Sequence, residues 1–359
     1  MHSLKFSLLD ANNEIERQAW IHYWEQWPER EIFAHPEYVR LYAGSGERAL
    51  CAAASCDGSY ILYPFLLRSL SEESYCDLSL RDSTDIVTPY GYGGPFRWGK
   101  AWNPEELSEF WKRFVAWVSQ ARVVSEVVRL SLFPDTLAEY AGDSHVVADN
   151  VVLKLRSEKE LWPEFEHKVR KNVNRARASG VTVDADETGH CLDNFMAIYT
   201  STMDRRNAGQ TYYFSREYFE RIHQTLKGQF MYFFSRVGAT VVSAELVLVS
   251  AERVYSFLGG TNADWFHVRP NDLLKMEIMN WAYSAGKKEF VMGGGYERGD
   301  GIYHYKLAFA PHGSVPFSIG SRIFDADAYQ QLVACRRRFA ASQAVEWHPK
   351  PDFFPAYRG

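Results

Sequence analysis

Three apolar runs in the second half of the sequence, separated by tight turns, constrain the fold of this chain most strongly. They are QFMYFFSRVG (229–238), ATVVSAELVLVSA (239–251) and RVYSFLGGT (253–261). Their aromatic and β-branched residues, and the turns at 237–238 and 250–252, predict three antiparallel strands joined by hairpins. A helix is then predicted from Pro270 to Gly286, which are typical start and stop residues, and KEFVMGG (288–294) reads as the next strand.

The segments around this meander extend the pattern. Helices are predicted before it, in ELWPEFEHKVRKNVNRARASG (160–180) and in the stretches beginning at 191 and 216. The order of helices, a meander, a helix, a strand, a loop and a final strand resembles that of a GNAT-type acyltransferase domain. The first half offers a looser copy, with a hairpin turning at 56–58, a strand leading into TPYGYGGPF, and a helix over 104–121.

The size of the chain fits two domains, because single cores rarely exceed about 250–300 residues. We therefore expect an α+β protein with two domains, residues 1–150 and 151–359. The formal net charge of -5 argues against a polyanion binder as a whole, although a local basic patch is compatible with it. Five scattered cysteines, early charges and the lack of an 18-residue apolar run predict a cytoplasmic protein without a signal peptide or a span.

The stretch GGGYERGDGIYHYKLAF (293–309) is rich in glycine but does not form a known phosphate-binding motif. Gly294 and Gly299 have the spacing of a Walker A loop, yet no lysine and hydroxyl residue follow them. The dinucleotide fingerprint fails as well, because Arg298 stands where its last glycine belongs. The alternating character of 303–309 predicts a strand in which Lys306 points away from Tyr303, Tyr305, Leu307 and Phe309.

Five segments in order resemble the FemAB/FemX family of peptidoglycan bridge aminoacyltransferases and the wider set of FemAB-like GNAT proteins. They are TPYGYGGPF (88–96), HKVRKNVNRARASGV (167–181), YTSTMDRR (199–206), NDLLKMEIMNWAYSAGKKEFVMGG (271–294) and YHYKLAFAP (303–311). The resemblance implies two tandem GNAT-like domains, each a mostly antiparallel twisted sheet flanked by helices, with a cleft between them. It also implies an enzyme that transfers an amino acid from aminoacyl-tRNA to an amine, often on a UDP-linked or lipid-linked muropeptide.

The resemblance also suggests roles for individual residues. Lys306, next to Tyr305, would stabilise the developing oxyanion, a task suited to a fixed ammonium; the competing interpretation is a solvent-facing lysine. Arg205, with Arg206 beside it, would bind an acceptor phosphate, whereas helix-end cations also occur simply because of the helix dipole. Tyr90, Tyr92 and Tyr212 are further expected substrate contacts, although each could instead be structural. The remaining expected contacts are Glu297, Arg298, Asp300 and Tyr303.

A basic stripe on the helix after residue 166 is the expected nucleic-acid contact. Lys168, Lys171 and Arg175 share one face of that helix, and residues 167–180 contain no acidic residue. The stripe is either an ordinary solvated face or a phosphate-binding surface for tRNA or a nucleotide-linked substrate.

The sequence does not identify the acyl donor or the general base of the reaction. The R/Q-x-x-G-x-G/A loop of acyl-CoA-using GNAT domains would fall at HVRPNDLLK (267–275), which has Arg269 but neither glycine. No metal-ligand cluster and no covalent-nucleophile motif appears, and no cofactor is expected. The favoured function is an aminoacyl-tRNA-dependent transferase acting on a cell-envelope or muropeptide-like amine, with contact to lipid-linked substrate at the membrane surface. The alternatives are an N-acyltransferase that uses acyl-CoA as co-substrate on a sugar- or lipid-linked amine, and a non-catalytic binding protein; the sequence does not indicate an oligomeric state.

Overall fold

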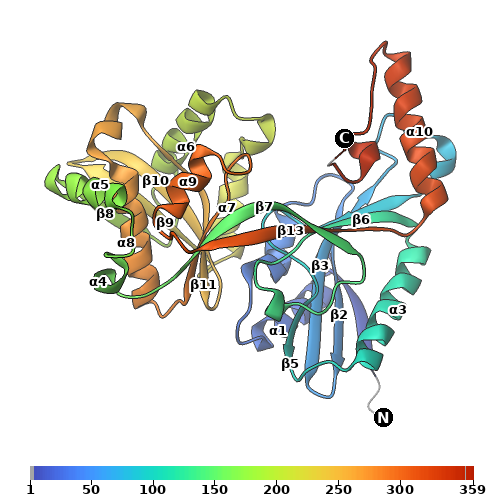
Figure 1. Ribbon diagram of the computed structural model, residues 1–359. Coiled ribbons are helices and arrows are strands. Elements are labelled where there is room, and N and C mark those ends of the chain that lie inside the picture. Colours follow the sequence, from blue (N-terminus) through green and yellow to red (C-terminus); the bar gives the residue numbers. More distant parts are fainter. Residues whose placement is uncertain (1–3, 352) are drawn as a thin grey trace. The chain divides into compact units, whose positions relative to one another are not determined.

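The computed structural model describes residues 4–351 and 353–359, in two compact units (Figure 1). Unit 1 comprises residues 1–28, 33–147 and 317–359, and unit 2 comprises residues 29–32 and 148–316. This differs from the division into 1–150 and 151–359, because residues 317–359 belong to unit 1. The reason is a long-range strand pairing: residues 319–323 of β13 (Ser314–Ile323) pair antiparallel with β6 (Val123–Arg129).

Unit 1 is built on a mostly antiparallel sheet with the strand order β1-β2-β3-β4-β6-β13. The hairpin predicted around residues 56–58 is confirmed, since Asp57 and Gly58 both have positive φ between two strands, the geometry of a type I′ turn. β4 and β6 are parallel, and α3 (Pro104–Gln120) connects them. The other strands are β1 (Lys5–Asp10), β2 (Arg48–Cys56), β3 (Ser59–Ser69), β4 (Thr84–Val87) and β5 (Phe96–Gly99), which pairs with β3.

The helices of unit 1 cover this sheet. α3 starts with a capping box between Asn103 and Glu106, and its stripe Phe110, Phe114 and Val118 packs into the core against β2 and β3. The remaining helices are α1 (Glu14–Gln26), α2 (Pro36–Arg40) and α10 (Ala326–Ser342), with 3₁₀ turns at η2 (Leu78–Leu80), η3 (Pro134–Thr136) and η6 (Ala356–Arg358). A further 3₁₀ turn, η1 (Ile32–Ala34), precedes α2.

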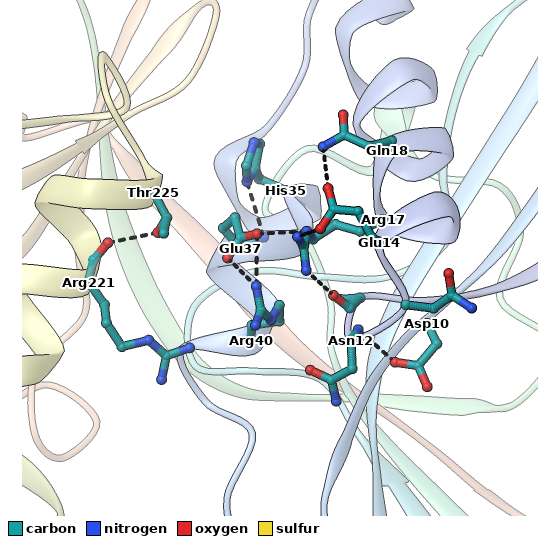
Figure 2. A network of polar contacts seen from close by, with 12 residues as sticks. Asp10, Asn12, Glu14, Arg17, Gln18, His35, Glu37, Arg40, Arg221 and Thr225 are labelled. Atoms are coloured by element: carbon teal, nitrogen blue, oxygen red, sulfur yellow. Dashed lines mark hydrogen bonds and ion pairs between the residues drawn. The ribbon is translucent and has the colours of Figure 1, made fainter.

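A polar network fixes the short helix α2 beside α1 (Figure 2). His35 caps α2, its Nδ1 accepting from the Glu37 amide at 3.2 Å. The Glu37 carboxylate in turn lies 2.9 Å from Arg40 Nη1 and 3.2 Å from Arg17 Nε. These contacts lie within unit 1 and hold the segment between α1 and β2 against α1.

Unit 2 has the strand order β7-β12-β11-β10-β9-β8. The predicted meander is confirmed as β9 (Phe230–Val237), β10 (Thr240–Val249) and β11 (Arg253–Thr261), with antiparallel pairing throughout. β11 and β12 (Glu289–Gly293) are parallel, joined by the buried helix α8 (Pro270–Ser284). The outer strands are β7 (Asp143–Lys154) and β8 (Val181–Asp186).

Two local predictions in unit 2 are corrected. The single helix expected over 160–180 is split into α4 (Glu158–Leu161) and α5 (His167–Ala178), because Pro163 has no amide and crowds the preceding turn. The strand expected at 303–309 is wrong: this segment is the helix α9 (Gly301–Leu307). The other helices of unit 2 are α6 (Leu192–Arg206) and α7 (Arg216–Thr225), with 3₁₀ turns η4 (Gln210–Tyr212) and η5 (Ala263–Val268).

The helical start at α9 has a clear cause. Asp300 is its N-cap, and the carboxylate accepts a hydrogen bond from the Tyr303 amide at 2.8 Å. Tyr303, Leu307 and Ala310 then recur at helical spacing and meet the core of unit 2. Tyr303 and Leu307 belong to both this helical pattern and the alternation that suggested a strand.

Candidate active site

The two parallel strands of unit 2 diverge at the place where polar side chains gather. β11 and β12 pair only between residues 253–255 and 289–291, while β11 continues to Thr261. Ligands of α/β sheets commonly bind at the carboxyl ends of such strands. The residues just beyond the divergence, and the first turn of α8, are therefore the candidate site.

Lys306 reaches this place from α9. Its Nζ donates to the Gly294 carbonyl, just after β12, at 2.6 Å. Burial, together with the nearby Lys275 ammonium, lowers the pKa of Lys306 to about 8, against the opposing effect of Glu245. An ammonium has three N–H donors, so this contact leaves donors for an oxygen of a ligand.

A buried ion pair lies next to Lys306 and was not predicted from the sequence. Lys275 of α8 and Glu245 of β10 are 5% and 4% exposed, and Lys275 Nζ lies 2.6 Å from Glu245 Oε1. Ser256 Oγ donates to the same carboxylate oxygen at 2.6 Å and lies 2.9 Å from Lys275 Nζ. The available signal was Glu245 within the apolar run of β10 and Lys275 between the apolar residues Leu274 and Met276, since charged residues are rarely buried unless they are paired.

The first turn of α8 holds two more polar pairs. The Tyr305 hydroxyl accepts from Asn271 Nδ2 at 2.9 Å, and burial raises the pKa of Tyr305. Asn172 of α5 donates to Asp272 Oδ1 at 3.1 Å, and burial raises the pKa of Asp272 to about 6. The amino end of α8 thus carries a carboxylate.

The glycine-rich loop between β12 and α9 owes its glycines to close packing. A Cβ at Gly294 would lie 2.9 Å from the Asp149 carbonyl oxygen of β7, and a Cβ at Gly295 would overlap Asp300 Oδ1. Asp300 also accepts from the Tyr296 and Glu297 amides at 2.7 and 3.2 Å, so it ties the loop to α9. These contacts explain the glycine run without a phosphate ligand.

The other predicted residues of this loop occupy different environments. Glu297 and Arg298 are exposed, and Arg298 Nε lies 3.2 Å from Asp149 Oδ2. Tyr303 is buried, and its hydroxyl donates to Ser314 Oγ at 2.7 Å.

The predicted arginine pair ends α6 near the last residue of β11. Arg205 Nη1 donates to the Thr261 carbonyl at 3.0 Å, and its guanidinium carbon lies 5.0 Å from the Phe266 ring centroid. Burial lowers the pKa of Arg205. Arg206 is exposed, and Tyr212 accepts a hydrogen bond from Tyr199 at its carbonyl. The structure thus holds Arg205 at the carboxyl end of β11.

The basic stripe faces solvent on α5. Lys168, Lys171 and Arg175 are exposed, while Val169 and Val173 on the opposite face are buried in the core of unit 2. Lys168 Nζ lies 3.2 Å from the Glu166 carboxylate. Within the described residues, Lys171 and Arg175 have no ion-pair partner.

Tyr90 and Tyr92 belong to unit 1. Tyr90 is 48% exposed, and its carbonyl accepts from the Tyr38 hydroxyl at 2.7 Å. Tyr92 packs edge-on against Phe33 and Phe317, and burial raises the pKa of Tyr92. Its ring is therefore part of the packing of unit 1.

Metal-binding and membrane-spanning features are absent from residues 4–351 and 353–359. This part of the chain has no cluster of three or more His, Cys, Asp or Glu side chains that could hold a metal ion. Nor does it contain a helix with the length and apolar character needed to cross a bilayer.

Comparison with known proteins places this geometry in a structural class. Residues 164–307 match the family model of the acetyltransferase (GNAT) domain. No curated protein matches the chain in sequence. FemX has a similar structure, with a TM-score of 0.67 and 13% identity over 88% of this chain and 98% of that chain.

Two further structures share the fold. One is the C-terminal domain of a putative lysylphosphatidylglycerol synthetase from Agrobacterium fabrum, with a TM-score of 0.54 and 13% identity over 92% of this chain and 98% of that one. The other is L-PGS from Bacillus licheniformis, with a TM-score of 0.52 and 11% identity over 90% and 96%. The chain therefore has the mixed α/β fold of FemX, and its residues 164–307 are similar to the acetyltransferase (GNAT) domain.

Proposed function

We propose that this protein is an aminoacyltransferase of the FemX type, which moves an amino acid from aminoacyl-tRNA to an amine of a cell-envelope precursor. The observation that carries the proposal is the Lys306 ammonium, held beside the diverging strands of a GNAT domain with donors to spare. Its lowered pKa, about 8, still leaves the group charged at neutral pH.

The chemistry follows from that group. The acceptor amine attacks the ester carbonyl of the aminoacyl-tRNA, so that a C–N bond forms and the carbonyl oxygen gains negative charge. Lys306 donates a hydrogen bond to this oxygen and stabilises the charge in a partly water-excluded setting. The C–O bond to the tRNA ribose then breaks, and the proton lost by the amine ends on the ribose hydroxyl. A charge-assisted contact of this kind contributes about 2.7–4 kcal/mol to lowering a barrier.

The amino end of α8 argues against acyl-CoA as the donor. A CoA-binding GNAT domain offers backbone amides there to the pyrophosphate. In this chain Pro270 has no amide to offer, and Arg269 adopts a left-handed conformation in place of a glycine-rich turn. The buried Asp272 carboxylate of the first turn would repel a diphosphate whenever it is ionised.

The basic stripe supports a nucleic-acid donor. Lys168, Lys171 and Arg175 present cations on one exposed helix face of an otherwise acidic protein. Such a stripe suits the backbone phosphates of tRNA. Arg205, fixed at the end of β11, is proposed to bind an acceptor phosphate through the free edge of its guanidinium.

The similar structures support aminoacyl transfer near a lipid surface. A lysylphosphatidylglycerol synthetase is named for a product in which an amino acid is joined to a phospholipid. We therefore favour an acceptor on a UDP-linked or lipid-linked muropeptide, with the protein acting in the cytoplasm and touching the membrane only peripherally.

A gel-shift experiment with charged tRNA tests the donor. Substitution of Lys168, Lys171 and Arg175 by glutamine should weaken binding and reduce the slope of log K against log salt by about 2–3, because each phosphate contact contributes about 0.7–0.9. The matched control replaces three exposed lysines elsewhere in unit 2, Lys154, Lys159 and Lys227, and should leave the slope unchanged. Equal losses in the two variants would contradict a tRNA site on α5.

A further inference from the structure

Unit 1 contains a cavity of about 690 Å³ at the carboxyl ends of its two parallel strands. Val87, the last residue of β4, and Arg129, the last residue of β6, line it. The C-terminal segment supplies another part of its wall, including Phe339 of α10 and Phe354. The volume lies within the range of small-molecule sites.

The cavity wall is strongly basic. Four arginines line it, Arg68, Arg129, Arg336 and Arg358, and the acidic residue in the wall is Glu73. Behind the wall, the fully buried Asp85 binds two of the four: its carboxylate lies 2.8 Å from Arg68 Nε and 2.5 Å from Arg358 Nε. Glu73 also pairs with Arg358. Arg358 thus engages both carboxylates, and Arg68 engages that of Asp85.

The other two arginines have no carboxylate partner in the described part of the chain. The guanidinium of Arg129 is half-buried and forms no hydrogen bond there, and burial lowers the pKa of Arg129. Arg336 lies over the rings of Tyr75 and Trp347, with its guanidinium carbon 5.5 and 5.6 Å from their centroids. A half-buried cation without a counter-charge costs stability, unless an anion binds beside it.

A buried hydroxyl in the same wall is also unsatisfied. Tyr75 is 7% exposed, and its hydroxyl has no hydrogen-bond partner among the described residues. Burial raises the pKa of Tyr75, so the hydroxyl stays protonated and can donate. Buried hydroxyls are nearly always bonded, and an unbonded one indicates a missing partner.

The C-terminal segment is fixed firmly enough to form a permanent wall. The Tyr357 side chain is fully buried, and its hydroxyl lies 2.7 Å from Ser125 Oγ and 3.1 Å from Asp85 Oδ2. The Ala356 amide donates to the Tyr329 hydroxyl at 2.9 Å. The aromatic residues of this segment add an apolar part to the cavity wall.

We propose that this cavity binds a phosphate ester, with Arg129, Arg336 and the Tyr75 hydroxyl as the groups that hold the phosphate. Two guanidinium groups without counter-charges match the charge of a phosphate monoester or a diphosphate, and arginine binds such groups in a bidentate manner. The aromatic side would pack against an organic group carried by the phosphate. The proposal concerns binding in unit 1 and does not depend on the transfer reaction proposed for unit 2.

Calorimetric titration of the full chain tests this site. The probes are inorganic pyrophosphate, uridine and adenosine diphosphate, and vesicles of phosphatidylglycerol, which separate a soluble phosphate ester from a lipid headgroup. We expect saturable binding of at least one probe with a stoichiometry of one. Arg129→Gln and Arg336→Gln should each weaken that binding at least tenfold. Failure of every probe to bind saturably would overturn the proposal.

The control is the adjacent residue on the same helix. Arg337 is exposed and does not line the cavity, so Arg337→Gln should change the affinity less than twofold. Thermal unfolding without any anion guards against misfolded variants: Arg129→Gln should melt at or above the wild-type temperature, because it removes an uncompensated cation. Affinity that is unchanged in Arg129→Gln, or reduced equally in Arg337→Gln, would show that the anion binds elsewhere.

Discussion

Replacing Lys275 by methionine leaves the Glu245 carboxylate buried between β10 and α8 without its cation. The pair is close, at 2.6 Å, and both side chains are almost fully inaccessible to water. Removing one partner of such a pair costs about 3–5 kcal/mol, because the remaining charge is uncompensated. The variant Lys275→Met should therefore destabilise unit 2 by about that amount, and Glu245→Gln should do so comparably.

The double variant Lys275→Met/Glu245→Gln separates this cause from simple loss of packing. It removes both charges, and the amide oxygen of the introduced glutamine can still accept from Ser256. The stability of the double variant should return to within about 1–2 kcal/mol of the wild type, since apolar or neutral replacements of buried ion pairs are often nearly neutral.

Hydrogen exchange of peptides from α8 is a suitable assay, because it reports local stability in a two-unit chain. A loss of about 3–5 kcal/mol corresponds to exchange faster by about two to three and a half orders of magnitude, at 1.4 kcal/mol per tenfold change. If the double variant exchanges as fast as Lys275→Met, the cost does not come from an unpaired charge, and the reasoning is refuted.

Three more predictions concern the same region. Because the pKa of Lys306 is about 8, the transfer rate should fall as pH rises through that value. Lys306→Arg should shift this fall in rate to higher pH, and an unchanged pH–rate profile in that variant would contradict the role of the ammonium. The pKa of Asp272 is raised to about 6 in the folded state, so the stability contributed by its protonated form is lost as pH rises through 6. Asp272→Asn should therefore raise the free energy of unfolding by up to about 3 kcal/mol above that pH and leave it unchanged at pH 3, as measured by urea titrations at the two pH values. Gly295→Ala should displace the Asp300 cap and cost about 0.5–2 kcal/mol by thermal unfolding, whereas Gly301→Ala, whose Cβ meets nothing within 4 Å, should be neutral; equal costs would argue against the packing explanation.

The sequence was informative where local signals and fold agree. The meander was predictable because its strands are bounded by tight turns, and α8 was predictable because Pro270 and Gly286 mark its ends. The fold class followed from the order of these elements and is confirmed by the GNAT match over 164–307 and by the fold shared with FemX.

Other features depend on contacts that no local pattern contains. The return of β13 to pair with β6 joins residues almost 200 positions apart, so the C-terminal segment could not be assigned to unit 1 from composition. The α9 segment fits both strand and helix periodicity, and the Asp300 cap decides between them. The partnership of Lys275 with Glu245 likewise required the packing of α8 on β10. The roles of Lys306 and Arg205 in transfer remain predictions.

The most direct test of the proposed function is a transfer assay run in parallel with two labelled donors. Wild-type protein is mixed with a UDP-linked muropeptide bearing a free lysine amine and with either labelled aminoacyl-tRNA or labelled acetyl-CoA. We predict that label passes to the muropeptide from the aminoacyl-tRNA alone, and that Lys306→Ala lowers the rate by about 10²–10³-fold without unfolding the protein. Label arriving from acetyl-CoA instead, no transfer from charged tRNA, or an undiminished rate in Lys306→Ala would contradict the account.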